Sequence, residues 1–288
     1  MTRGVGRFYW WAALAIAGGV GIVLNSLWLN WGSPHSLNQM PVSGQPSPPT
    51  PASVPHEGLR LQLNYQQWLD ILSQEAQSAA TKAPPRLTIL AGDSLSLWFP
   101  TDLLPTSQNW LNQGISGETS YGLLRRLRLF DQTRPERILV MIGINDLIQG
   151  VRDATLLANY QEIIQHLKQA HPRTTIIVQS ILPHGADRWQ QPTDQPNLPD
   201  PPLWVERLQQ VPNSHIRDLN RQLAEIADIE GVIYLDLHSK FTDINGDLLP
   251  HLSTDGLHLS HQGYQVWKAQ LETIPLSAQI TPTSRRSP

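Results

Sequence analysis

Short apolar runs of strand length alternate along this chain with longer segments of helical periodicity. The most apolar run, 138–143 (ILVMIG), has no polar side chain, which is typical of a strand buried on both faces of a parallel sheet. Strands that alternate with helices are joined by crossovers, and these are nearly always right-handed. We therefore expect an α/β domain built on a mostly parallel sheet.

Five runs are predicted to be strands, and five segments are predicted to be helices. The predicted strands are 87–90, 109–112, 138–143, 174–182 and 232–237. The predicted helices are 59–80, 120–130, 153–170, 214–229 and 261–272. The helix predictions rest on apolar residues that recur every three or four positions, as in the segment 153–170.

An uncharged apolar segment, 10–31, precedes this domain and carries two tryptophans at each end. As a helix it would be about 33 Å long, enough to cross the apolar core of a bilayer, with its tryptophans at the two interfaces. Arg3 and Arg7 lie before it, so we expect a single-pass anchor with the catalytic domain outside the cytoplasm. The alternative is a cleaved signal peptide and a secreted protein, although no clean A-x-A cleavage site follows.

Composition then divides the chain into four parts: the anchor with its cytoplasmic stub (1–31), a linker (32–56), the folded domain (57–274) and a flexible tail (275–288). The linker holds seven of the 24 prolines. The folded domain holds all 24 acidic residues and 17 of the 21 basic ones, so its net charge is −7. This charge disfavours nucleic acid as a partner.

The chain contains no cysteine, which excludes disulfide scaffolds, cysteine-ligated metal sites and cysteine nucleophiles. Candidate reactive residues instead follow the ends of predicted strands, where active sites of open parallel sheets lie. They are Ser94, Gly117, Asn145, Asp255 and His258. Each also fits a structural role when taken alone, for example as a helix cap or a turn glycine.

A metal site is an alternative interpretation of the last region, because His251, Asp255, His258 and His261 lie close together in the sequence. Imidazoles and a carboxylate at such spacing are ligands that zinc accepts. A zinc hydrolase is therefore retained as a less favoured hypothesis, beside a non-catalytic binding module.

The four blocks together resemble the SGNH hydrolases, also called GDSL esterases and lipases. The matching blocks are G-D-S-L with Ser94, N-Q-G-I-S-G-E-T with Gly117, G-I-N-D with Asn145, and D-G-L-H with Asp255 and His258. The resemblance covers roughly residues 86–183 and 214–272. The stretches IIVQSILPHG and DGLHLSHQGYQVW are most similar to esterases of the platelet-activating-factor acetylhydrolase type, and the lysophospholipase/thioesterase type is also similar.

This resemblance implies a flavodoxin-like three-layer α/β/α sandwich with five parallel strands. It implies that Ser94 is the nucleophile, His258 the base and Asp255 its orienting carboxylate. The oxyanion hole would consist of the Ser94 and Gly117 N–H groups and the Asn145 side chain, with no cofactor. The implied activity is hydrolysis of acyl or acetyl esters of small molecules, lipids or glycans. An O-acyltransferase or deacetylase acting on cell-envelope glycans is the alternative.

One segment departs from the family pattern: the insertion 184–213 is much longer than the connection in the short acetylhydrolase-like relatives. Its apolar residues could form a wall over the site, or the segment could be a surface excursion. We accordingly treat Trp98, Trp189 and Trp204 as candidate substrate-binding residues.

Overall fold

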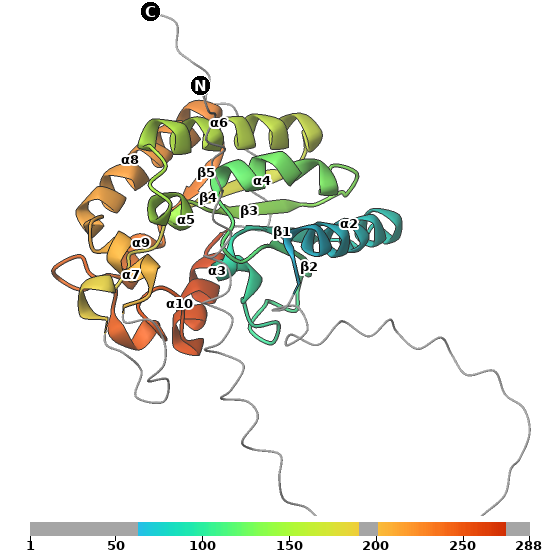
Figure 1. Ribbon diagram of the computed structural model, residues 1–288. Helices are drawn as coiled ribbons and strands as arrows, with labels where there is room; N and C mark the ends of the chain where they lie inside the picture. The colour runs from blue at the N-terminus through green and yellow to red at the C-terminus, as the bar shows by residue number, and fades with distance from the viewer. Residues whose placement is uncertain (1–62, 190–200, 275–288) are drawn as a thin grey trace, which may run out of the picture. The chain divides into compact units, whose positions relative to one another are not determined.

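The computed structural model describes residues 63–189 and 201–274 (Figure 1). The chain divides into two units, Met1–Trp68 and Leu69–Pro288. Of the first unit, only 63–68 are described, and they include the first turn of α2 (Tyr65–Lys82). The predicted anchor, linker and tail lie outside the described residues. Within the described ranges, no helix combines the length and apolar character needed to span a bilayer.

The second unit is built on a parallel sheet with the strand order β2-β1-β3-β4-β5. The strands are β1 (Leu87–Gly92), β2 (Asn109–Gly114), β3 (Arg137–Met141), β4 (Thr175–Gln179) and β5 (Ile233–Leu235). This is the flavodoxin-like order. The connection after β1 runs to β2 on one side, and the connection after β3 runs to β4 on the other. The topological switch point therefore lies between β1 and β3, and ligands bind at such points.

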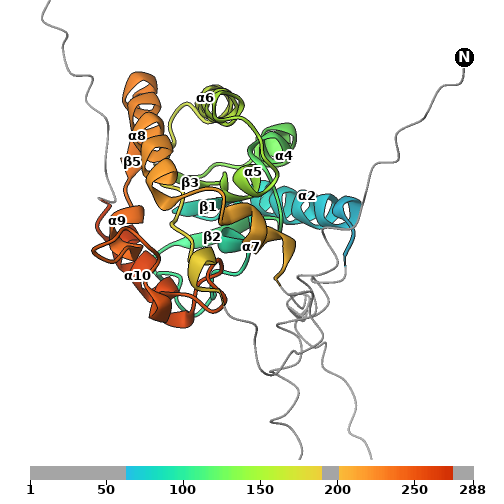
Figure 2. The same cartoon turned by 60° about the vertical axis from the view of Figure 1, so that its left-hand side comes forward.

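Helices cover both faces of the sheet (Figures 1 and 2). Figure 2 shows α4, α6 and α8 over one face and α9 and α10 over the other. The helices besides α2 are α3 (Ser94–Leu97), α4 (Ser120–Arg126), α5 (Ile144–Ile148), α6 (Asp153–Ala170), α7 (Leu203–Leu208), α8 (Asn213–Glu230), α9 (His238–Phe241) and α10 (His261–Glu272). Three short 3₁₀ segments are η1 (Leu127–Phe130), η2 (Ala186–Arg188) and η3 (Pro250–Leu252).

The core consists of two apolar clusters, one on each face of the sheet. Ile138 and Val140 of β3 belong to the cluster under α4, α6 and α8, whereas Leu139 and Met141 belong to the cluster under α9 and α10. Side chains of a strand alternate between faces, and both faces of β3 are covered. This explains why its sequence is apolar throughout rather than alternating.

The predicted insertion 184–213 contains a helix that was not predicted from the sequence. Its helix α7 buries Val205 and Leu208 completely in the first of the two clusters. Residues 190–200 of the insertion lie outside the described ranges. The described part is therefore packed structure, and its helix α7 is not a surface excursion.

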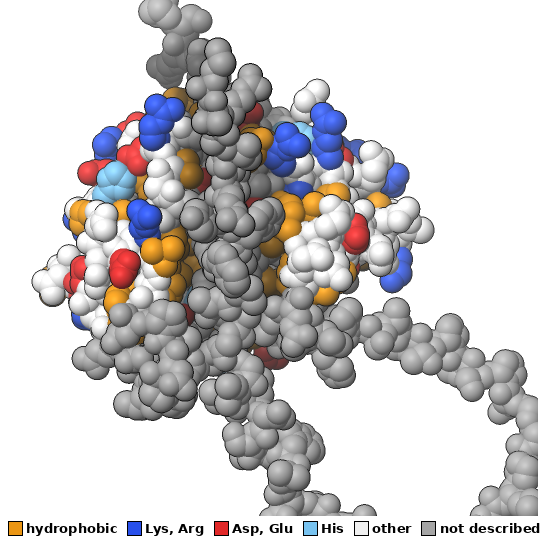
Figure 3. Space-filling model, in the orientation of Figure 1, with side chains coloured by type: hydrophobic (Ala, Val, Ile, Leu, Met, Phe, Trp, Pro, Cys, Tyr) orange, Lys and Arg blue, Asp and Glu red, His pale blue; other side chains and the backbone are white. Residues whose placement is uncertain are grey.

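Charges of both signs are interspersed on the face of the molecule drawn in Figure 3. Neither the basic nor the acidic side chains form one continuous field there. The face in view does not present the basic stripe by which nucleic-acid-binding domains are recognised.

Candidate active site

Ser94 lies at the carboxyl end of β1, where the chain turns into the short helix α3. Asp93 caps this helix, because its Oδ1 accepts the N–H of Leu95 at 3.0 Å. Ser94 is therefore the first helical residue rather than the cap, and it is 5% exposed. The alternative in which Ser94 serves as an N-cap does not apply. Its hydroxyl is carried by a hydrogen-bonded turn at the switch point of the sheet.

A second loop, residues 253–259, carries Asp255 and His258 just before α10. Oδ2 of Asp255 lies 2.7 Å from Nδ1 of His258. The loop is closed on itself: the N–H of Thr254 donates to the His258 carbonyl at 2.9 Å, and Ser253 Oγ donates to it at 2.7 Å. Both the ring and the main chain of His258 are thus held in place, with the ring only slightly exposed.

The charge state of Asp255 suits an orienting group. Burial raises the pKa of Asp255, but the hydrogen bond and charge of His258 and the backbone N–H bonds outweigh it, so the net pKa is lowered. Asp255 is therefore a carboxylate at neutral pH. As an acceptor at Nδ1, it leaves Nε2 as the ring nitrogen that could take a proton.

Two contacts bring the His258 loop against the Ser94 turn. The ring of Trp98, the residue that ends α3, lies 4.3 Å from the His258 ring between centroids. The hydroxyl of Tyr264 in α10 donates to the carbonyl of Leu95 at 3.0 Å. The structure therefore brings the Ser94 turn and the His258 loop together from opposite ends of the domain.

Gly117 and Asn145 come from the connections that follow β2 and β3, at the same edge of the sheet. Gly117 has φ of +76°, a conformation that favours glycine, and the space beside its Cα is open. Asn145 lies in α5, and its Nδ2 donates to the carbonyl of Glu118 at 3.0 Å. One of the two amide hydrogens thus fixes the side chain beside the Gly117 loop, and the other remains available for a ligand.

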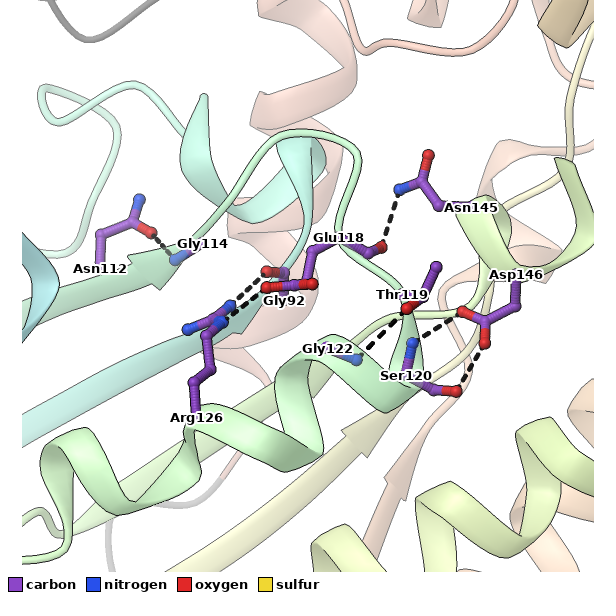
Figure 4. Close-up of polar contacts among 10 residues, drawn as sticks. All are labelled: Gly92, Asn112, Gly114, Glu118, Thr119, Ser120, Gly122, Arg126, Asn145 and Asp146. Atoms are coloured by element: carbon purple, nitrogen blue, oxygen red, sulfur yellow. Dashed lines mark hydrogen bonds and ion pairs between the residues drawn. The ribbon is translucent and has the colours of Figure 1, made fainter. Parts of the chain in front are cut away.

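The neighbouring Asp146 ties α5 to the start of α4 (Figure 4). Its Oδ2 accepts the N–H of Ser120 at 2.8 Å, and its Oδ1 accepts the Ser120 hydroxyl at 2.6 Å. Burial raises the pKa of Asp146, opposed by the bonds from Ser120. Sequence reasoning singled out Asn145 in this block and missed Asp146. The available signal is that Asp146 is the one acidic residue of the short segment Ile144–Ile148.

A third carboxyl group is that of Asp93, the residue directly before Ser94 in the sequence. Burial raises the pKa of Asp93 to about 7, against the lowering effects of its bond to Leu95 and the charge of His258. The negative charges of Asp146 and Glu118 contribute to this rise in the pKa of Asp93. Among the described residues, no hydrogen-bond partner reaches its second oxygen, Oδ2. Nothing in the sequence indicates that this acid is buried, beyond its place in G-D-S-L.

The three candidate substrate-binding tryptophans occupy different environments. Trp98 is half-buried against His258. Trp189 borders a cavity of about 230 Å³ beside Asp255. Trp204 is 8% exposed and packs in the core cluster under α4, α6 and α8. The cavity is lined by Gly185, Arg188, Trp189, Leu248, Pro250, Ser253, Thr254, Asp255 and Gly256. Only the first two tryptophans are thus placed beside Asp255 and His258.

The histidines considered for zinc are not gathered into a ligand set. His258 faces Asp255, whereas His261 Nε2 lies 4.0 Å from Asp102 at an exposed position. In the described parts of the chain, no three His, Cys, Asp or Glu side chains are grouped so that they could hold a metal ion. The geometry gives the zinc hypothesis no support.

One buried pair next to Gly117 was not predicted. Arg126 Nε lies 2.8 Å from Glu118 Oε2, and the two side chains are 3% and 5% exposed. The available signal is helical phase: Arg126 follows Leu123 by three positions and so shares its buried face. Two other arginines in the same segment, Arg125 and Arg128, conceal this signal.

The model of the GDSL-like lipase/acylhydrolase family matches residues 90–266 of this chain. An arylesterase of Vibrio mimicus is 27% identical over 130 residues, which are 39% of this chain and 63% of the arylesterase. The platelet-activating factor acetylhydrolase IB subunit alpha1 of Rattus norvegicus is 24% identical over 213 residues, covering 68% of this chain and 77% of the relative.

A solved structure from Streptococcus pneumonia, described as a platelet activating factor protein, has the same fold. It superimposes with a TM-score of 0.56 at 27% sequence identity. The match covers 72% of this chain and 95% of that protein.

Proposed function

The chain belongs to the GDSL-like lipase/acylhydrolase family and is a carboxylic ester hydrolase, and we propose that it works through an acyl-enzyme on Ser94, with His258 as base and Asp255 as its orienting carboxylate. The observation that carries the proposal is the 2.7 Å contact between Asp255 and the His258 ring, on a loop that packs against the Ser94 turn. A serine hydroxyl becomes a useful nucleophile when such a base accepts its proton.

In the first step, Ser94 Oγ forms a bond to the ester carbonyl carbon while its proton passes to Nε2 of His258. The carbonyl oxygen becomes an oxyanion, and the imidazolium is stabilised by Asp255. Collapse of this intermediate breaks the bond to the alcohol oxygen, which leaves with the proton from His258.

In the second step, water attacks the acyl carbon and gives a proton to His258. Collapse releases the carboxylic acid and returns the proton to Ser94 Oγ. In both steps the oxyanion would accept hydrogen bonds from the N–H groups of Ser94 and Gly117 and from the free amide hydrogen of Asn145. Such donors, fixed before reaction, commonly provide the largest part of the rate enhancement.

The proposed substrates are uncharged or weakly charged acyl esters, including acetyl esters. The acidic domain disfavours strongly anionic substrates. The similarities to an arylesterase and to a platelet-activating factor acetylhydrolase support small acyl groups, and Trp98 and Trp189 would form the apolar surface of the site. Transfer of the acyl group to a glycan hydroxyl in place of water is an outcome that the test below separates.

The test compares the chain with Ser94→Ala on p-nitrophenyl esters of increasing acyl length. We expect turnover by the wild type, labelling of Ser94 by a fluorophosphonate, and loss of up to about 10⁶-fold in kcat in the variant. Full turnover by Ser94→Ala would overturn the proposal, and if that turnover is abolished by a chelator it would point to a metal hydrolase. Adding a glycan acceptor and analysing the products separates transfer from hydrolysis.

We further propose that residues 10–31 anchor the enzyme with its catalytic domain outside the cytoplasm. The support is the sequence alone: the uncharged, tryptophan-flanked segment and the two preceding arginines. Protease treatment of intact spheroplasts tests this placement. Release or digestion of the catalytic domain from outside is the expected result, and full protection of the domain would contradict it.

A further inference from the structure

The ion pair between Arg126 and Glu118 is buried beside the proposed oxyanion hole. Its side chains are 3% and 5% exposed, and Arg126 lies on the face of α4 that carries the fully buried Leu123. Buried ion pairs are poor sources of net stability, because the cost of removing both charges from water offsets their attraction. A role in positioning explains the presence of this pair better than a contribution to stability.

The same guanidinium also reaches the end of β1. Arg126 Nη2 donates to the carbonyl of Gly92 at 3.1 Å, two residues before Ser94 (Figure 4). The position of β1's last carbonyl, and so of the turn through Asp93 into α3, is thereby tied to α4.

Through Glu118, the ion pair is also connected to the segments that carry the other two proposed donors, Gly117 and Asn145. It directly follows Gly117, so its position sets that of the Gly117 loop. Its carbonyl accepts the Nδ2 hydrogen of Asn145 at 3.0 Å, and its carboxylate accepts from Arg126 (Figure 4). One pair of residues is therefore bonded to all three segments that carry the proposed oxyanion donors.

We propose that Arg126 and Glu118 are positioning residues that hold the Ser94, Gly117 and Asn145 segments in the mutual arrangement the oxyanion requires. This inference rests on the proposed function. The three donors come from separate connections after β1, β2 and β3, and each lies beyond the last paired residue of its strand. Donors stabilise an oxyanion only when they are held within a fraction of an ångström of the productive position.

Gly122 provides space for this arrangement. A Cβ at Gly122 would overlap the Glu118 carboxylate. An alanine there suits a helix better than glycine, yet it would displace the carboxylate from Arg126. Gly122→Ala therefore disturbs the pair while leaving both charged residues in the chain.

The test is steady-state hydrolysis of p-nitrophenyl acetate by Glu118→Gln and Gly122→Ala, with competent sites counted by fluorophosphonate labelling. We expect kcat per labelled site to fall by about 10-fold or more, with KM changed less than about 3-fold, because a displaced oxyanion donor acts in the transition state. Arg126→Lys, which keeps the positive charge beside Glu118, should lower kcat per labelled site by less than Glu118→Gln does. A kcat per labelled site within about 2-fold of wild type for both variants would overturn the proposal.

A double-mutant comparison separates positioning from general destabilisation. Glu118→Gln should have a smaller effect in an Asn145→Ala background than in the wild type, because both changes act on one oxyanion hole. Multiplicative effects would contradict this. Glu230→Gln, which removes an acidic charge from the bridge between α6 and α8, is the matched control and should leave kcat unchanged. Failure of the proposed function would show differently, as turnover by Ser94→Ala.

Discussion

A single carboxylate, that of Asp255, holds both the ring and the main chain of His258. Its Oδ2 lies 2.7 Å from Nδ1 of the ring, while its Oδ1 accepts the backbone N–H of the same residue at 2.7 Å. The ring nitrogen and the peptide nitrogen are thus fixed relative to one another by one side chain. This arrangement explains how two residues three apart in a loop, with no helix to align them, can present Nε2 in a defined direction.

Asp255→Asn is expected to lower kcat by up to about 10⁴-fold with little loss of folded protein. The amide retains an acceptor for the main chain but can donate toward Nδ1, which favours the wrong tautomer. Esterase kinetics on correctly folded protein provide the measurement. Asp131→Asn is the matched control, because Asp131 makes a similar 2.8 Å contact with His166 away from the site. A loss of less than 10-fold at Asp255 would argue against the orienting role.

Asn145→Ala is expected to lower kcat by about 10²–10³-fold, since it removes an oxyanion donor and the bond that holds the Glu118 carbonyl. KM should change little, because the interaction develops in the transition state. Asn109→Ala serves as the control: its Nδ2 also donates to a backbone carbonyl, that of Pro85, but at the amino end of β2. Equal kcat values for the two variants would show that Asn145 is not a donor.

Asp93 is expected to make stability depend on pH between about 4 and 7. Its pKa is about 7 in the folded chain and near 3.8 when unfolded, so in this window the folded chain retains a proton that the unfolded chain has lost. The free energy of unfolding therefore falls as pH rises through the window, by about 4 kcal/mol from this group. Urea unfolding at a series of pH values measures the change.

Asp93→Asn isolates this contribution. The amide oxygen can still accept the N–H of Leu95, but the side chain no longer titrates, so the variant should show a flatter pH profile and should exceed the wild type in stability above pH 7. Asp146, whose pKa is also raised by burial, is present in both proteins. Parallel profiles would mean that Asp93 stays ionised in the fold.

Trp98→Ala is expected to lower kcat by about 10-fold and Trp98→Phe by less, because the indole packs against the His258 ring. Loss of one face of packing lets the imidazole occupy other rotamers. Hydrolysis of acetate and longer esters should be compared, since a change confined to long esters would assign Trp98 to substrate binding alone. Trp110→Phe, in β2, is the control.

The fold could be predicted from the sequence where a strand is buried on both faces of the sheet. The run 138–143 was predicted as a strand and largely coincides with β3, Arg137–Met141, because a central parallel strand is buried on both faces. The helices 153–170 and 261–272 were predicted with the bounds that the structure has. β5 was predicted too long, as 232–237, because an edge strand has one partner and its half-buried residues pair with β4 over only three positions.

Sequence reasoning picked out the candidate site residues whose type is tied to a chemical role. It missed those whose place near the site depends on contacts between distant parts of the chain. Ser94, Asp255 and His258 stand out because the candidate nucleophile, carboxylate and base come in the order of the family blocks. Arg126 carries no such mark, since only the folded chain brings its guanidinium to the carbonyl of Gly92, 34 residues away. The burial of Asp93 and the charges that act on it, those of His258, Asp146 and Glu118, likewise depend on segments far apart in the sequence.

The described part of the insertion is expected to contribute to stability through α7, and two leucines of that helix provide a matched test. Leu208 is fully buried in the core cluster, whereas Leu203 is 55% exposed. Leu208→Ala should therefore lower the free energy of unfolding by about 2–5 kcal/mol through lost burial and a cavity. Leu203→Ala should change it by less than about 0.5 kcal/mol, as for most surface substitutions. Urea denaturation of both variants measures the difference, and equal effects would mean that α7 does not belong to the cooperative core.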